Sequence, residues 1–138
     1  MRIDLRNNLA RLLIFLVTFL NLQCAIQFLL APWNYSPGFE LSGSAGDAMI
    51  RGLGLLFVMW NVPYVIALIN PVKYRVSLLE AVVMQFIGAV GETVILLTLP
   101  GNHPALTGSV TRFIIFDGAG FFVLLAALLL VLRRPKQG

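Results

Sequence analysis

Five ionisable side chains lie within stretches of the sequence that are otherwise strongly apolar. If such a stretch crosses a membrane, each charge costs several kcal/mol unless it is paired or hydrated, so each one is a functional candidate. A carboxylate there could take part in proton transfer, act as a general acid or base, or pair with an arginine. The five residues are Arg51, Glu80, Glu92, Arg112 and Asp117.

Four of these charges are expected to lie close to one another. Arg51 and Arg112 stand near the beginning of their apolar stretches. Glu92 and Asp117 lie about seven residues, roughly 10 Å along a helix, from the same boundary of the apolar layer. Two arginines and two carboxylates sum to zero charge, and arginine forms bidentate pairs with carboxylates. We therefore expect at least one carboxylate of this charge cluster within salt-bridge distance of an arginine.

Two glutamines extend the charge cluster to the first apolar stretch. Gln23 and Gln27 stand one helical turn apart and share a helix face. Polar residues between membrane helices can fix register and partner choice without further function, which is one interpretation of the cluster. The other interpretation is a binding site, because the cluster holds more polar groups than a small bundle needs for packing.

The second apolar stretch contains a proline beside polar and aromatic residues. Pro63 leaves the carbonyl of Met59 without its helical donor and predicts a kink. Trp60, Asn61 and Tyr64 flank this kink and could form the wall of a pocket, for which Glu80 is a further candidate. Tight packing around the bend is the interpretation that the pattern favours.

Two further ionisable residues have simpler interpretations. Glu80 stands three residues after Ser77, which predicts a capping box, or an ion pair with Lys73 or Arg75. His103 is the only histidine and lies in a short connection, where a histidine is usually solvated.

Several chemistries have no support in the sequence. We find no cluster of histidine, cysteine and carboxylate for a metal, no intramembrane histidine for haem and no glycine-rich phosphate loop. A nucleophile elbow and an intramembrane lysine for retinal are also missing. We therefore predict no metal and no cofactor.

The composition predicts a membrane protein. Of 138 residues, 59% are hydrophobic and 12% are charged, and the mean hydropathy is +0.89. A soluble domain is about a quarter charged, so this chain lacks the polar residues to cover a surface in water. The net charge of +4 comes mainly from basic residues beside apolar runs, which favours membrane topology over nucleic-acid binding. The single Cys24 excludes an intramolecular disulfide.

Four apolar stretches are long enough to cross the roughly 30 Å hydrocarbon layer of a membrane. Since none alternates with period two, we predict one all-α domain over residues 1–138, an antiparallel four-helix transmembrane bundle. The first stretch also follows a basic start, as in a signal peptide, but it lacks a small-residue cleavage site. The spans are about 9–31, 48–69, 76–99 and 110–132.

Lysine and arginine predict the orientation. Connections 32–46 and 100–108 carry neither residue, which places them outside by the positive-inside rule. Both termini are then cytoplasmic, in a membrane that we expect to be the bacterial inner membrane, and the charge cluster lies in the outer leaflet. The basic flanks consist of Arg2, Arg6, Lys73, Arg75, Arg133, Arg134 and Lys136.

The first connection is the longest and carries Trp33, Tyr35 and Phe39. An aromatic belt at the membrane interface is the favoured interpretation. A lid over the outer mouth of the bundle is the alternative. Glycines stand beside both carboxylates of the cluster and predict close helix approaches there.

The chain resembles the DoxX-like superfamily of small four-helix membrane proteins. The resemblance rests on the Arg-Gly-Leu-Gly stretch at 51–54, the Gly91-Glu92 pair, and the charges Arg112 and Asp117. It implies a four-span fold with cytoplasmic ends. Some members of this superfamily are linked to redox or quinone-associated complexes, and eukaryotic relatives bind sterols or act as membrane chaperones. Where some members carry an arginine in the third helix, this chain has Glu92.

Three functions remain open from the sequence. The first is a non-enzymatic protein that binds a membrane lipid or another lipophilic molecule, or a partner subunit or second copy of itself. The second is a small transporter or channel subunit in which Glu92 or Asp117 couples to protons. The third is a lipid-modifying enzyme with a carboxylate as general acid or base, which ranks last because neighbouring arginines are expected to hold both carboxylates ionised.

Overall fold

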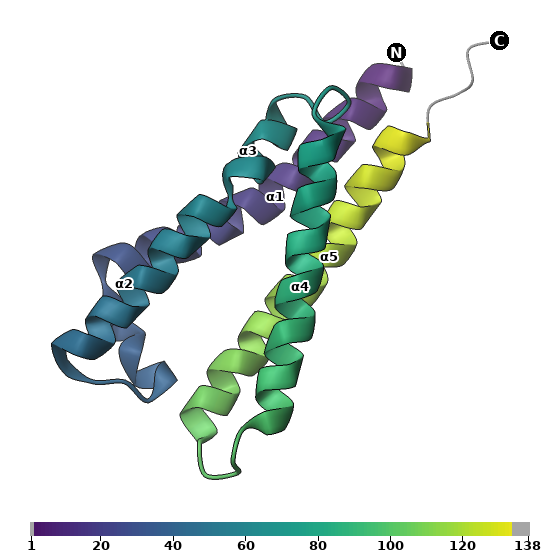
Figure 1. Ribbon diagram of the computed structural model, residues 1–138. Coiled ribbons are helices and arrows are strands. Elements are labelled where there is room, and N and C mark those ends of the chain that lie inside the picture. The colour runs from purple at the N-terminus through teal and green to yellow at the C-terminus, as the bar shows by residue number, and fades with distance from the viewer. Residues whose placement is uncertain (1, 134–138) are drawn as a thin grey trace.

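Long runs of leucine, valine, alanine and phenylalanine with few interior breaks form the helices of the computed structural model, which describes residues 2–133 (Figure 1). These residues contain helices and connections but no strand. Arg134 and Lys136 of the predicted basic flank lie outside the described residues. The elements are α1 (Arg2–Leu30), η1 (Pro32–Asn34), η2 (Ser36–Phe39), α2 (Gly43–Trp60), α3 (Val62–Ile69), α4 (Arg75–Thr98) and α5 (Pro104–Leu132).

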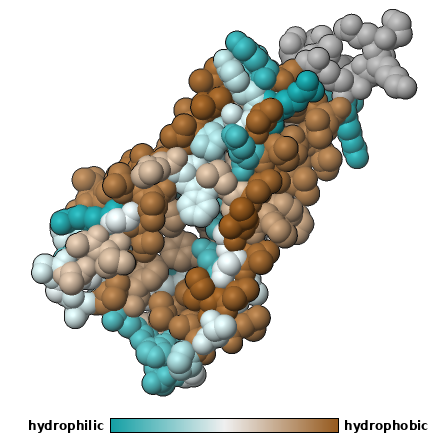
Figure 2. Space-filling view, in the orientation of Figure 1, coloured by the Kyte–Doolittle hydropathy of each residue, from teal (hydrophilic) through white to brown (hydrophobic). Residues whose placement is uncertain are grey.

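Four helical segments of the described chain are long and apolar enough to cross a membrane: Leu5–Leu30, Gly43–Ile69, Arg75–Thr98 and Pro104–Leu132. The second comprises α2 and α3. Many large hydrophobic side chains are exposed on the bundle, and brown, apolar residues cover much of the face seen in Figure 2. Large side chains such as Leu97, which is 80% exposed, face outward. In water such a surface would aggregate, whereas lipid solvates it. The chain is therefore an integral membrane protein.

Helices α2 and α5 begin at Gly43 and Pro104, several residues before the predicted spans. Pro104 occupies the first turn of α5, where its missing N–H costs nothing. The free N–H of Leu106 donates to a carboxylate oxygen of Glu40 at 3.3 Å. This partner is distant in sequence, so no local pattern could reveal it.

The predicted kink is present where α2 ends and α3 begins. The side-chain amide of Asn61 donates to the carbonyl of Phe57 at 2.7 Å, and Pro63 lies in the first turn of α3. Helix α3 packs against α1 and α4. Within the described residues, α2 packs against α1, α3 and the first connection but has no close backbone contact with α4 or α5. The kink thus separates the first half of this span from the α4–α5 pair.

The bundle is closed at one end and open at the other. The start of α1 and the end of α5 lie at the closed end, which we call the terminal end, and the two helix pairs diverge toward the opposite, loop end (Figure 1). The main core joins α1, α3, α4 and α5 on the terminal side of the kink. Fully buried side chains in this core are Ala10, Ile14, Ala67, Leu78, Ala81, Leu124 and Ala127.

Helices α4 and α5 approach each other through two reciprocal contacts. A Cβ atom at Gly88 would overlap the carboxylate of Asp117, and a Cβ at Gly120 would overlap the amide nitrogen of Gln85. Each helix therefore uses a glycine to receive a polar side chain of the other. Close approach at small residues is typical of membrane helices, which gain their stability from packing rather than from leaving water.

The first connection folds over the loop end and forms a cap, which we define as residues 32–41. Its two short helical turns are closed by the bond from the backbone N–H of Leu41 to the carbonyl of Ser36 at 3.0 Å. The hydroxyl of Ser36 donates to Asp47 at 3.1 Å. Glu40 ends the second turn in the left-handed conformation, with φ of 57°. Asp47 thus holds the cap, and its side chain does not cap the N-terminus of α2.

Candidate functional site

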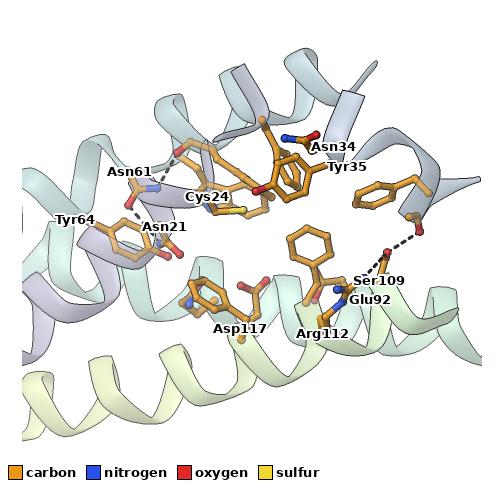
Figure 3. A pocket seen from close by; sticks show the side chains of 18 residues that line it. Asn21, Cys24, Asn34, Tyr35, Asn61, Tyr64, Glu92, Ser109, Arg112 and Asp117 are labelled. Atoms are coloured by element: carbon orange, nitrogen blue, oxygen red, sulfur yellow. Dashed lines mark hydrogen bonds between the residues drawn. The ribbon is translucent and has the colours of Figure 1, made fainter. Parts of the chain in front are cut away.

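A cavity of about 390 Å³ lies between the α1–α2 side of the bundle and the α4–α5 pair. It exists because α2 diverges from α4 and α5 beyond the kink. Figure 2 shows the surface hollowed between the two halves of the molecule, and Figure 3 shows that all four spans and the cap contribute side chains to the lining.

Five aromatic rings close the cavity toward the loop end, and we call them the aromatic wall. Phe28 of α1 is the centre of this group: its ring centroid lies 4.9 Å from that of Tyr35 and 5.8 Å from that of Phe57. Phe113 of α5 lies 5.9 Å from Phe57 and 5.9 Å from Phe39. Rings from α1, α2, α5 and the cap thus meet across the opening that the helix backbones leave.

Three polar side chains line the cavity from α4 and α5, and we call them the polar floor: Gln85, Glu92 and Asp117. Gln85 is only 4% exposed, and its amide nitrogen has no hydrogen-bond partner. One carboxylate oxygen of Glu92 is also buried without a partner. The carboxylate of Asp117 points into the cavity (Figure 3). An unpaired buried polar group costs about 1–3 kcal/mol, so the polar floor has unsatisfied capacity for hydrogen bonds.

Toward the terminal end, the cavity is closed by polar contacts across the kink. The side-chain amide of Asn21 donates to the side-chain oxygen of Asn61 at 3.3 Å. Tyr64 is 1% exposed, and its hydroxyl donates to the backbone carbonyl of Ala81 on α4 at 3.3 Å. These bonds join α1, the α2–α3 junction and α4, and so hold the bend that opens the cavity.

The cap is tied to α5 by a short chain of hydrogen bonds. Ser109 donates its hydroxyl to the carbonyl of Gly38 at 2.6 Å. The guanidinium of Arg112 donates in turn to the Ser109 hydroxyl at 3.2 Å. Gly38 and Ser109 both line the cavity, so these bonds hold the cap over it.

A second tie lies outside the predicted spans. Glu40 pairs with Nδ1 of His103 at 2.5 Å and also accepts the N–H of Leu106. The hydrogen bond to His103 is the main cause that lowers the pKa of Glu40 below its ordinary value, followed by the bond from Leu106. His103, which was expected to be solvated, is therefore half of a latch between the cap and the α4–α5 connection.

The expected ion pairs of the charge cluster are not formed. Within residues 2–133, the carboxylates of Glu92 and Asp117 have no arginine within salt-bridge distance. Arg51 is exposed and does not line the cavity, because the kink carries its half of the span away from α4 and α5. Arg112 lines the cavity but bonds to Ser109. The structure therefore brings Glu92, Arg112 and Asp117 to one site and leaves Arg51 out.

The glutamines of the cluster also differ from expectation. Gln27 is exposed and accepts the hydroxyl of Tyr35 at 2.6 Å, so it supports the cap from outside the cavity. Gln23 is exposed and does not line the cavity. The first span contributes Asn21 and Cys24 instead, because these residues lie on a different face of α1.

The residues around the kink form a pocket wall. Trp60, Asn61 and Tyr64 all line the cavity, so tight packing, the favoured interpretation, explains only the terminal side of the bend. Glu80 is exposed and away from the cavity. Neither its capping box nor its ion pair is found among the described residues.

The cavity is also lined by four residues that the sequence did not predict as site residues: Asn21, Cys24, Gln85 and Ser109. Their signal was weak because none carries a charge, and single uncharged polar residues are tolerated throughout membrane helices. For the aromatic residues of the first connection, the sequence favours an interfacial belt over a lid on the outer mouth of the bundle. Tyr35 and Phe39 line the cavity, whereas Trp33 is exposed.

Comparison with family models finds no match, and neither do comparisons with curated proteins and with solved structures.

Proposed function

We propose that this membrane protein binds a lipophilic small molecule in the cavity between its two helix pairs. The observation that carries the proposal is that the polar floor and the aromatic wall line one cavity. A volume of about 390 Å³ is in the range of ligand pockets, about 300–1,000 Å³. A molecule with an apolar body and one polar group could contact the rings and bond to Gln85, Glu92 or Asp117.

The proposal includes the position of the site in the membrane. We propose the antiparallel order of the four spans, with both termini cytoplasmic, in a bacterial inner membrane. The basic flanks support this orientation. The cavity then lies in the outer half of the membrane, beneath the cap. A DoxX-like origin, with its links to lipophilic ligands, is compatible with this function and remains part of the proposal.

The test uses Cys24, the only cysteine of the chain, which lines the cavity. The protein is purified in mild detergent and its bound small molecules are identified by native mass spectrometry. Wild type and Cys24→Ser are expected to carry the same lipophilic molecule, because serine and cysteine have similar size. Cys24→Phe should lose the molecule, because its ring occupies the cavity.

A second measurement covers the case in which Cys24→Phe misfolds. In wild type, alkylation of Cys24 by a small maleimide should accelerate after the bound molecule is removed by extensive detergent washing and slow again when the extract is returned. If wild type carries no specific molecule and the alkylation rate never changes, the proposed binding function is wrong.

A second candidate is a proton-coupled transporter, which the two carboxylates without a basic partner favour. Flux of a lipophilic substrate into proteoliposomes would then depend on a proton gradient and be lost in Glu92→Gln and Asp117→Asn. An enzyme has less support, because no hydroxyl or thiol among the described residues is hydrogen-bonded to either carboxylate as a nucleophile would be.

A further inference from the structure

The charges around the cavity point to the class of its ligand. We infer that the cavity takes a lipophilic monovalent cation, such as a protonated amine or a quaternary ammonium with an apolar body. This inference rests on the binding function proposed above and specifies the ligand.

The first observation is the charge balance of the lining. Glu92, Asp117 and Arg112 are its only formally charged residues within the described chain, so its formal charge is −1. Arg112 does not neutralise either carboxylate by an ion pair, since its guanidinium bonds to Ser109 at the cap. One positive charge on the ligand would balance the site.

The second observation is that aromatic rings line the same cavity as these carboxylates. A cation within about 6 Å of a ring face is attracted by the ring quadrupole, and the attraction is stronger when the site excludes water. Phe57, Phe113 and Trp60 border the cavity together with the carboxylates. Carboxylates and aromatic rings in one cavity would suit an organic cation, whose charge is spread over a bulky apolar body.

The third observation is a buried neutral polar side chain in the same lining as the two carboxylates. Gln85 is nine-tenths or more buried and lines the cavity, and its amide nitrogen, which has no hydrogen-bond partner, lies against Gly120 of α5. An amide N–H donates and is not satisfied by a cation, so the contact assigned to Gln85 in the ligand complex is its side-chain oxygen, which accepts. Its burial beside Glu92 and Asp117 gives the polar floor both neutral and anionic groups for an occupant.

A metal ion fits this lining less well than an organic cation. Among the described residues, no three histidine, cysteine or carboxylate side chains gather as metal ligands. A hydrated ion would also gain little from rings that cover one side of the cavity. An organic cation can contact both the aromatic rings and the carboxylates.

The test measures binding of three probes to the purified full-length protein in a non-ionic detergent. The probes are tetraphenylphosphonium, tetraphenylborate of the same shape but opposite charge, and uncharged triphenylphosphine oxide. We expect tetraphenylphosphonium to bind at least about tenfold more tightly than the other two, and to slow alkylation of Cys24.

Matched variants test the assigned carboxylates. Glu92→Gln and Asp117→Asn keep the side-chain size and remove the charge, so each should weaken tetraphenylphosphonium binding by about tenfold or more. Glu80→Gln removes an exposed carboxylate away from the cavity and should have no effect. Since Asp117 packs against Gly88, its substitution can disturb the fold, and thermal melting checks that each variant is folded. If Asp117→Asn misfolds, Glu92→Gln alone tests the role of the carboxylates.

The same assay identifies the source of the cation. Competition by phosphatidylethanolamine, but not by phosphatidylglycerol, would assign the site to an amine lipid headgroup. If neither lipid competes, a free lipophilic amine is assigned.

The cation inference is overturned if the anionic or neutral probe binds as tightly as tetraphenylphosphonium, if no probe binds, or if both carboxylate variants bind normally. A co-purified neutral molecule together with any of these results would leave the proposed binding function standing and reject only its ligand class. No co-purified molecule and no probe binding would reject both.

Discussion

At the residue scale, the position of Asp117 depends on a glycine of the neighbouring helix. The carboxylate lies against Gly88 of α4, where a Cβ atom would overlap it. Gly91 stands one turn further along the same helix with nothing within 4 Å of its Cβ position. The two glycines therefore form a matched pair, of which one shapes the site and the other does not.

We predict that Gly88→Ala displaces the Asp117 carboxylate and weakens tetraphenylphosphonium binding by about three- to tenfold, which is about 0.7 to 1.4 kcal/mol of affinity. Gly91→Ala should leave binding unchanged. Both variants should remain folded, because alanine favours a helix by about 1 kcal/mol over glycine. Binding isotherms and thermal melting check both statements, and an equal loss in the two variants would contradict the assigned role of Gly88.

At the element scale, the cap is held by a latch that depends on pH. Glu40 accepts hydrogen bonds from His103 and Leu106, which favour its charged form and lower its pKa below the ordinary value of 4.5. A carboxylate with a lowered folded-state pKa contributes stability above its unfolded-state pKa. This contribution is lost as the pH falls through the folded-state value.

We predict that Glu40→Gln lowers the melting temperature at neutral pH, and that the difference from wild type disappears as the pH falls below the folded-state pKa of Glu40. Amide exchange in the cap should accelerate in this variant at neutral pH. Glu80→Gln, which removes an exposed carboxylate without a recorded ion pair, is the control and should show no such pH-dependent difference. A wild-type advantage that persisted at acidic pH would argue against the latch.

At the scale of the whole molecule, the kinked second span determines where the bundle opens. Its α3 half packs with α1 and α4 at the terminal end, and its α2 half diverges beneath the cap. The closed end holds the apolar core, and the open end holds the cavity. A stable core and a binding site thus coexist in one small bundle because each half of the span has a different neighbour.

The proposed orientation predicts which connections face the cytoplasm. In a Cys24→Ser background, Asn102→Cys should react with a membrane-impermeant maleimide in intact cells, whereas Lys73→Cys should react only after the membrane is opened. Both positions are exposed on connections between spans. The Cys24→Ser protein without a new cysteine gives the background, and the reverse labelling pattern would invert the proposed topology.

Composition and hydropathy alone predicted the helical class, the membrane and the four spans. These properties depend on the local requirement that a lipid-exposed backbone satisfy its own hydrogen bonds over about 20 apolar residues. Pro63 predicted the kink for a similarly local reason, its missing N–H. Glu92, Arg112 and Asp117 could be selected as site residues because charges are costly in lipid wherever they face.

Only the tertiary structure decided how these residues combine. The direction in which α2 diverges excludes Arg51 from the cavity, and the bond to Ser109 keeps Arg112 from the carboxylates. The partners of Glu40 lie more than 60 residues away in sequence, beyond any local pattern. The sequence predicted that arginines would neutralise Glu92 and Asp117, but in the structure neither carboxylate has an arginine partner. Side-chain pairing depends on how the helices pack and not only on depth in the membrane.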